Sequence, residues 1–243
     1  MLGIVTIQGY VDRVYRVKTV TIDLERSPTC DMNSAVAPRA LRNSSAKRGK
    51  LRRRSSETRE NVLSVAHELF YWSGIRATGI DRVAAEAEVA PTALYRVFSS
   101  KDALVAAYVA RMDQNYRAWF TEATRADGRT AAERIVSLFD ALTERVQPEI
   151  CRGCPFLMAL TEFPDADLEA HRIAARLKRW VRARFRNLAA ELASERTHGR
   201  VTPRLLADHL MLLFEGVYAT VQALGPMGPA RRARYVVAAL VKD

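Results

Sequence analysis

Residues 62–104 read VLSVAHELFYWSGIRATGIDRVAAEAEVAPTALYRVFSSKDAL. Apolar residues return every three or four positions in three short segments, which is the period of amphipathic helices. Gly74 ends the first segment, and Pro91 fits the first turn of the third, where the missing N–H of a proline costs nothing. Three short helices joined by tight turns form the helix-turn-helix layout, whose last helix lies in the major groove of DNA.

Polar residues next to these segments predict where the helices begin. Ser55 or Ser56 is expected to cap the first helix. Two stretches have the spacing of a capping box, Thr78–Asp81 before the second helix and Ser99–Asp102 before a long fourth helix that runs to about Glu122.

The helical period continues to the end of the chain. A further capping box at Thr130 and Glu133 opens a fifth helix. Pro203 and Pro229 each fit the first turn of a later helix. No convincing strand remains after Ser56, so the expected fold class is all-α. The helices expected beyond residue 122 span 130–146, 156–163, 167–196, 203–224 and 229–240.

The positive charge is concentrated at the N-terminus. The net charge is +11, and residues 1–56 hold 12 Lys and Arg against 4 Asp and Glu. Residues 39–54 contain 8 Lys and Arg, no acid and little apolar surface, which predicts a disordered basic tail able to follow a polyanion. Residues 1–31 alternate weakly like a strand without a partner, so disorder is expected there too. Met32 is a second plausible translation start.

Cysteine usage and hydropathy exclude several classes of protein. The chain has three cysteines, two of them in the lone pair Cys151 and Cys154, which favours a reducing cytoplasm over secretion. No run of 18 apolar residues indicates a membrane span. We expect no metal, no cofactor and no enzymatic activity. A redox-responsive regulator that uses Cys151 and Cys154 stays open, and a thiol enzyme would need a base, for which His171 is the nearest histidine.

The stretch from Glu68 to Leu104 resembles the TetR family of transcriptional regulators. The resemblance lies in the spacing of Phe70 and Gly74, in Ala77–Ala84, and in Val89 with Leu94–Asp102. It implies a three-helix helix-turn-helix DNA-binding domain followed by a helical-bundle effector and dimerisation domain. The expected domains are the disordered basic tail (1–55), the DNA-binding domain (56–104) and the ligand-binding and dimerisation domain (105–243).

The resemblance also implies which residues contact double-stranded DNA. Arg96 is the best candidate for a base contact, because a guanidinium can donate two hydrogen bonds to guanine. The Tyr95 hydroxyl and the Lys101 ammonium would contact phosphate, while Thr78 would offer its hydroxyl at a helix N-terminus. The complete set of expected DNA-binding residues is Thr78, Gly79, Pro91, Thr92, Ala93, Tyr95, Arg96 and Lys101.

Two residues of the turn depart from the family pattern. Glu88 stands where a glycine is usual, so it is expected to adopt a left-handed conformation at a cost of about 1–2 kcal/mol. Ala90 replaces the usual Ser or Thr and removes a helix cap. Residues 57–104 also hold five basic and seven acidic residues, so the basic run at 39–54 is expected to supply part of the DNA affinity.

The remainder of the chain is rich in large side chains, which in helical bundles line ligand pockets. The expected partner is a small and largely apolar effector. Glu162, His171 and Gln222 are candidates to orient it, and most of the aromatic residues are expected to be core. The complete set of expected ligand-binding residues is Tyr116, Trp119, Phe139, Phe156, Glu162, Phe163 and His171.

The last two expected helices suggest a homodimer. Gly216, Ala219 and Ala223 would permit close approach of two helices. A homodimer would present two DNA-reading helices to a near-palindromic operator. Repression is the expected outcome, with activation by a nucleic-acid-binding protein as the alternative. The expected apolar seam consists of Leu206, Leu210, Leu213, Val217 and Leu224.

Overall fold

A computed structural model of the chain describes residues 39–147, 151–195 and 202–242, with side chains from residue 55 onward apart from that of residue 226. The expectations for residues 1–31 therefore lie outside the described residues. The chain divides into two compact units, 1–45 and 46–243, and the account below concerns the second. Its described residues form helices and no strand, which confirms the all-α fold class.

Helix α2 (Arg39–Ser73) begins well before the expected caps at Ser55 and Ser56. These serines lie inside the helix, and residues 39–54 are helical rather than disordered, so both expectations were wrong. The physical reason is local: residues 39–73 contain no proline and are rich in Arg, Lys, Ala and Leu, which have high helix propensity. The low hydrophobicity of residues 39–54 did not predict their backbone conformation.

Thr78 closes the end of α2 instead of opening the next helix. Gly74 adopts φ +93°, and its N–H donates to the carbonyl of Phe70. The buried Thr78 hydroxyl then donates to the Gly74 carbonyl at 2.8 Å. Helix α3 (Ile80–Glu86) begins after Gly79, with no side-chain cap. The expected Thr78–Asp81 capping box is therefore absent, because the Thr78 hydroxyl donates to the carbonyl of Gly74, directly after α2.

The turn between α3 and α4 (Pro91–Val97) has the two expected departures. Glu88 adopts φ +53°, which confirms the left-handed conformation of a residue that is not glycine. Ala90 stands at the N-cap of α4 without a side-chain hydrogen bond. The turn is held by backbone bonds, among them Val89 N–H to the Ala84 carbonyl at 3.0 Å. Leu94 is fully buried on the inner face of α4.

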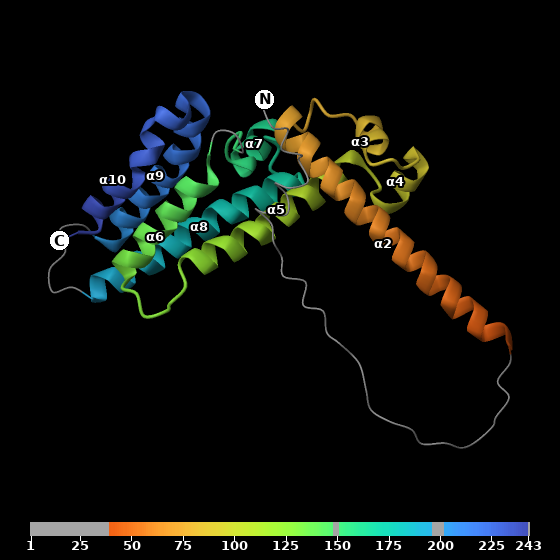
Figure 1. Cartoon of the computed structure of the whole chain (residues 1–243), viewed down its shortest axis with the longest axis horizontal. Helices are drawn as coiled ribbons and strands as arrows, with labels where there is room; N and C mark the ends of the chain where they lie inside the picture. Colours follow the sequence, from red (N-terminus) through yellow and green to blue (C-terminus); the bar gives the residue numbers. More distant parts are fainter. Residues whose placement is uncertain (1–38, 148–150, 196–201, 243) are drawn as a thin grey trace, which may run out of the picture. The chain divides into compact units, whose positions relative to one another are not determined.

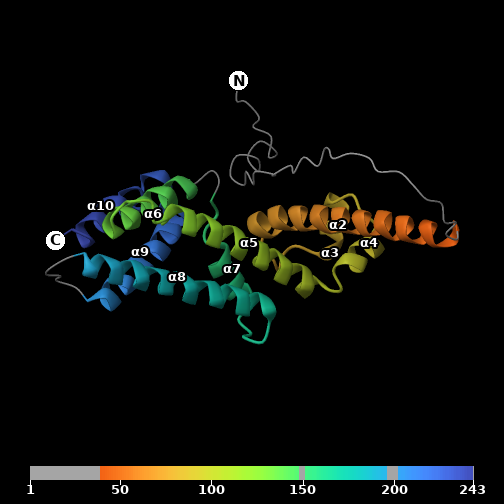
Figure 2. The same ribbon diagram turned by 90° about the horizontal axis from the view of Figure 1, so that it is seen from below.

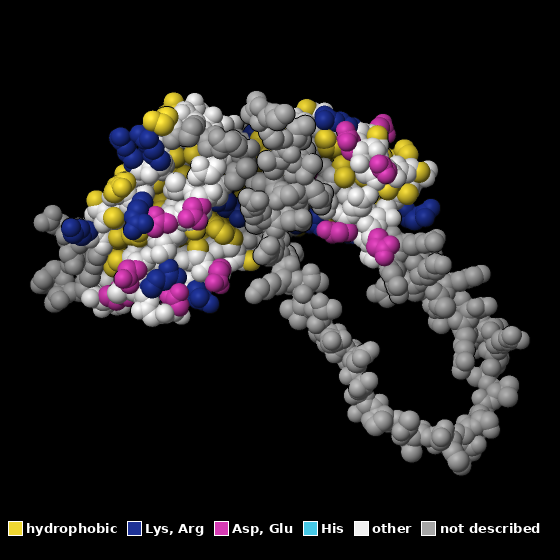
Figure 3. Space-filling view, in the orientation of Figure 1, with side chains coloured by type: hydrophobic (Ala, Val, Ile, Leu, Met, Phe, Trp, Pro, Cys, Tyr) yellow, Lys and Arg dark blue, Asp and Glu magenta, His cyan; other side chains and the backbone are white. Residues whose placement is uncertain are grey.

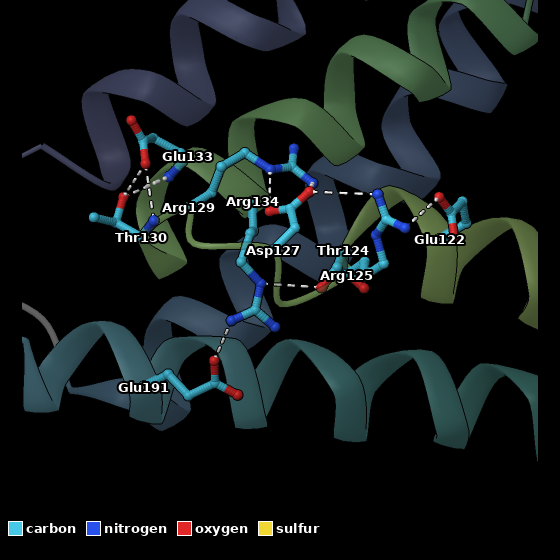
Figure 4. A network of polar contacts seen from close by, with 9 residues as sticks. All are labelled: Glu122, Thr124, Arg125, Asp127, Arg129, Thr130, Glu133, Arg134 and Glu191. Atoms are coloured by element: carbon cyan, nitrogen blue, oxygen red, sulfur yellow. Dashed lines mark hydrogen bonds and ion pairs between the residues drawn. The ribbon is translucent and has the colours of Figure 1, made fainter.

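Helix α5 (Lys101–Ala123) is capped one residue later than expected, by Ser100, whose hydroxyl accepts from the N–H of Ala103 at 3.1 Å. Helix α6 (Ala131–Arg145) opens with both hydrogen bonds of the expected capping box between Thr130 and Glu133. Figure 4 shows this box beside the buried guanidinium of Arg134, which joins the α5–α6 connection to Glu191 of α8.

The remaining helices are α7 (Pro155–Glu162), α8 (Glu169–Ser194), α9 (Pro203–Leu224) and α10 (Ala233–Leu240), with 3-10 turns at Gly225–Met227 and Pro229–Arg232. The expected last helix is thus a 3-10 turn followed by α10. Helix α8 lies along both α5 and α9, and α10 packs on α6 (Figures 1 and 2). The fully buried aromatic side chains of this bundle include Phe120, Phe139, Phe156, Phe185 and Phe214.

Candidate nucleic-acid interface

Helix α4 has one buried face and one exposed face. Leu94 and Phe98 are 0% and 3% exposed and hold the helix against the domain. Tyr95 is 49% exposed, and Thr92 and Arg96 are also exposed. The outer face therefore offers a phenol hydroxyl, a guanidinium and a threonine hydroxyl, all groups that hydrogen-bond to base edges or phosphates. Pro91 is exposed and Ala93 half-buried at the start of the same helix.

The residues expected to contact phosphate differ in their exposure to solvent. Gly79 is exposed at the start of α3, as a backbone contact would require. Thr78 is 0% exposed and its hydroxyl donates to the Gly74 carbonyl, so the expectation that this hydroxyl binds phosphate was wrong. The half-buried Lys101 donates to the Arg76 carbonyl at 3.2 Å, which leaves its ammonium with further protons for a phosphate.

Other basic residues of this region serve the fold. The Arg59 guanidinium lies 4.2 Å from the Phe98 ring centroid and donates to the Val97 carbonyl. Arg111 of α5 pairs with Glu60 of α2. Arg82, by contrast, is exposed on α3. Sequence reasoning did not select Arg82 as a DNA-binding residue, although its place opposite the buried Val83–Ala84 face predicts exposure.

Four of the seven expected ligand-binding residues meet in one aromatic cluster. The Tyr116 ring lies 5.3 Å from Trp119 and 5.4 Å from Phe156, and Phe139 lies 5.9 Å from Phe214. The buried Tyr116 hydroxyl lies beside that of Tyr218. Burial and the nearby Tyr218 raise the pKa of Tyr116 well above its usual range, so the hydroxyl is protonated.

The other three, Glu162, Phe163 and His171, lie outside this aromatic cluster and contact other residues of the chain. The Glu162 carboxylate accepts from the backbone N–H groups of Ile75 and Arg76 at 3.1 and 2.6 Å. The Arg76 guanidinium lies 5.5 Å from the Phe163 centroid. His171 Nδ1 donates to the Phe163 carbonyl at 2.8 Å. The expectation that Glu162 and His171 orient a ligand beside the aromatic cluster was wrong, because their polar atoms already have partners in a different place.

A small hollow of about 180 Å³ does touch Phe163, between α5 and α8. Its other lining residues include Val105, Ala106 and Leu168. Its size suits a few atoms rather than a drug-sized effector. Gln222, a further candidate for orienting a ligand, is exposed.

The two described cysteines are buried free thiols, with Cys154 3% exposed. Lys178 Nζ lies 3.1 Å from Cys154 Sγ and 2.6 Å from Glu215 Oε1. Burial raises the pKa of the Cys154 thiol, although the Lys178 ammonium opposes this. A protonated and inaccessible thiol reacts slowly with oxidants and electrophiles. In the part of the chain that the structure describes, no group of three His, Cys, Asp or Glu side chains is placed to hold a metal ion.

Helices α9 and α10 expose an apolar surface. A groove between them is lined by His209, Leu212, Gly216 and Ala233, among others. Of the expected seam, Leu213 and Val217 line this groove, whereas Leu206 and Leu210 were wrong, because they are buried inside the protomer. Figure 3 shows apolar side chains at the surface where Figure 1 places α9 and α10. The large exposed apolar residues here are Leu205, Leu212, Leu224, Tyr235 and Val236. Among the described helices, none has the length and apolar character needed to span a membrane.

Two family models match the chain. Residues 62–108, which include α3 and α4, match the model described as bacterial regulatory proteins, tetR family. Residues 131–237 match the model described as tetracyclin repressor-like, C-terminal domain.

Individual proteins agree with these models. A TetR-family transcriptional regulator from Streptomyces coelicolor is 30% identical, with a TM-score of 0.66 over 76% of this chain and 93% of that one. The HTH-type transcriptional regulator YjdC of Escherichia coli strain K12 is 26% identical over 164 residues, 65% of this chain and 80% of YjdC. A TetR regulator from Chloroflexus aurantiacus, 24% identical over 78% of this chain and 96% of its own, shares the fold with a TM-score of 0.66.

Proposed function

The chain belongs to the TetR family of bacterial transcriptional regulators, and from that premise we propose that it is a ligand-responsive repressor. In this proposal a homodimer binds a near-palindromic operator in the cytoplasm and leaves it when a small molecule binds. Residues 56–104 are the DNA-binding domain, and residues 105–243 bind the ligand and the second protomer.

The outer face of α4 is the observation that carries this proposal. Leu94 and Phe98 fix the helix from behind, so Thr92, Tyr95 and Arg96 project outward. Arg96 reads a base edge, because it is exposed and its fork of donors matches guanine O6 and N7. Tyr95 and Lys101 position the domain on the backbone, together with the exposed Gly79 at the start of α3.

The surface on α9 and α10 supports a homodimer. Leu205 and Leu212 lie seven residues apart and are 48% and 72% exposed, which places them on one side of α9. Exposed apolar surface of this kind marks an interaction site. A two-fold axis through the groove would bring the same surface of two protomers together and bury these side chains.

The aromatic cluster supports an effector in the bundle. Tyr116 is a buried phenol that faces Tyr218, and two neighbouring phenols can still accept or donate a further hydrogen bond. A largely apolar molecule with one polar group would fit the aromatic walls and could hydrogen-bond to these hydroxyls. The alternative redox response is less favoured, because Cys151 and Cys154 are both buried.

The test is selection of genomic DNA fragments by the purified protein, combined with sedimentation of the complex. The proposal expects an enriched near-palindromic motif bound by a dimer or by a pair of dimers. A monomer at micromolar concentration that prefers no fragment would refute it.

A further inference from the structure

Arg145, the last residue of α6, carries a positive charge that has no anionic partner within the described part of the chain. Its half-buried guanidinium lies 5.1 Å from the centroid of the Trp119 ring. Stacking on Trp119 and the negative end of the α6 dipole hold the guanidinium without using its N–H donors. These donors make no hydrogen bond to another described residue, so they are available to an acceptor from outside the chain.

Arg117 of α5 shows what Arg145 lacks. The Arg117 guanidinium lies over a different tryptophan, Trp180, at 4.7 Å, and it also pairs with the Asp113 carboxylate at 2.8 Å. A half-buried cation loses part of its hydration, and a carboxylate partner normally offsets that loss. Arg145 has the same aromatic support as Arg117 but no such carboxylate among the residues that the structure describes.

The titratable groups that sense the Arg145 charge are neutral. Burial raises the pKa of the Tyr116 and Tyr218 phenols above their usual range, and in Tyr218 the Arg145 charge opposes this rise. Burial, followed by the charges of Arg111 and Arg145, lowers the pKa of His67 to about 4. All three side chains are therefore uncharged at neutral pH and do not balance the guanidinium.

The Glu215 carboxylate of α9, which also raises a phenol pKa in this group, is already paired. Lys178 Nζ of α8 lies 2.6 Å from Glu215 Oε1, so these two charges cancel. Arg152, just before α7, is a further half-buried cation, and it donates to the Tyr71 carbonyl at 3.0 Å. Like Arg145, it forms no ion pair with a described residue. This part of the bundle therefore has an excess of positive charge.

Aromatic surface adjoins the guanidinium. The Tyr116 ring lies 5.3 Å from Trp119 and 5.4 Å from Phe156, and Phe214 lies 6.4 Å from Trp119. Trp119 and Arg145 are both half-buried, so part of each side chain remains accessible from solvent. Aromatic walls with one or two polar groups suit a molecule with an apolar body and a polar end.

We propose that the effector is an aromatic carboxylate, with its apolar body against Trp119 and Phe156 and its carboxylate bound by Arg145. A guanidinium binds a carboxylate through two parallel hydrogen bonds. The Tyr116 and Tyr218 hydroxyls are donors for a further hydrogen bond to the same molecule. A neutral molecule would leave the Arg145 charge unpaired, and a cation would add to the positive charge. The inference rests on the proposed function in taking the bundle as the effector site, and it names the chemical class of the effector.

The test compares probes that share one apolar body and differ in charge. Calorimetry on the full-length protein without DNA measures the Kd of phenylpropionate, of the neutral phenylpropanamide and of the cationic phenylpropylamine. Naphthylacetate and its amide repeat the comparison with a larger body. The Kd of each carboxylate should be about tenfold lower than that of its amide, because only the carboxylate pairs with Arg145. The amine should bind more weakly than either.

Substitution of Arg145 assigns the preference to this side chain. Arg145→Gln should raise the Kd of the carboxylates about tenfold and leave that of the amides unchanged. Arg145→Lys should retain part of the preference, because an ammonium keeps the charge but lacks the planar fork. Arg117→Gln is the matched control, since it removes a guanidinium that also stacks on a tryptophan, and it should change neither Kd. Thermal unfolding followed by circular dichroism checks that each variant is folded.

Three results would overturn the proposal: equal binding of carboxylates and amides, tighter binding of the amine, or no binding of any probe. An unchanged carboxylate Kd in both Arg145 variants would equally refute it. Release of the selected operator is measured separately, and the carboxylates should release it while the amides do not. Carboxylate binding without release would refute the assignment of this class as the effector. Absence of DNA binding by the wild type would instead refute the proposed function, while the charge preference measured without DNA would stand.

Discussion

Leu212→Asp should separate the protomers of the proposed dimer without unfolding them. Leu212 is 72% exposed on α9 and lines the groove between α9 and α10. An aspartate there costs little in an isolated protomer, because the position faces solvent. In the dimer it would place a charge against apolar surface, and the two-fold axis would do so twice.

The magnitude follows from the exposed fraction. Full burial of a leucine side chain contributes about 1.5–3 kcal/mol, so the exposed part of Leu212 contributes about 1–2 kcal/mol per protomer. The loss for the dimer is about 2–4 kcal/mol, which raises the dimer Kd by about 30- to 800-fold. The penalty for the buried charge adds to this value.

Sedimentation equilibrium across a concentration series measures the dimer Kd, and circular dichroism checks that the protomer stays folded. Leu157→Asp is the matched control, since Leu157 is an exposed leucine on α7, 38% exposed, away from the groove. It should leave the dimer Kd unchanged. Leu210→Asp should instead unfold the protomer, because Leu210 is 0% exposed and does not line the groove. An intact Leu212→Asp dimer at wild-type affinity would show that this surface is not the interface.

Four further outcomes are expected. Arg96→Ala should lower specific affinity by about 1–3 kcal/mol and relax one base pair per half-site, whereas Lys101→Ala should weaken all duplexes alike; fluorescence anisotropy on operator variants separates the two. Glu88→Gly should raise the free energy of unfolding, measured by urea denaturation, by about 1 kcal/mol, because a glycine adopts φ +53° without steric strain. Because burial raises the pKa of Cys154, a disulfide reagent at pH 8 should modify this thiol far more slowly in the native than in the denatured protein; equal rates would restore the redox alternative. A chain that begins at Ser55 should keep its preferred sequence with a salt slope shallower by about two to four units, and superimposable slopes would show that residues 39–54 do not touch DNA.

The helix-turn-helix was predictable because its signals are local. Pro91 and the apolar period each specify backbone conformation within a few residues, and the structure agrees with both. The left-handed Glu88 followed instead from the resemblance, in which a glycine is usual at this position. The Thr78 capping box failed for a reason that the sequence does not contain. A threonine hydroxyl can serve the helix before it or the helix after it, and only the placement of the Gly74 carbonyl decides.

The apolar faces of α9 could not be separated from the sequence. This helix is apolar over most of its circumference, so its period does not say which side packs inside the protomer and which side meets a partner. Leu206 and Leu210 turned inward, and Leu205 and Leu212 outward. Glu162 was similarly ambiguous, because its partners Ile75 and Arg76 lie more than eighty residues away in the chain.

Selection and sequencing of genomic fragments bound by the wild type and by Arg96→Ala is the most direct test of DNA recognition by α4. The account predicts a two-fold symmetric motif for the wild type, with half-sites one helical turn of DNA apart or a multiple of it. For Arg96→Ala it predicts the same spacing and a loss of preference at one base pair in each half-site. An identical motif for both proteins, or no motif for the wild type, would contradict it.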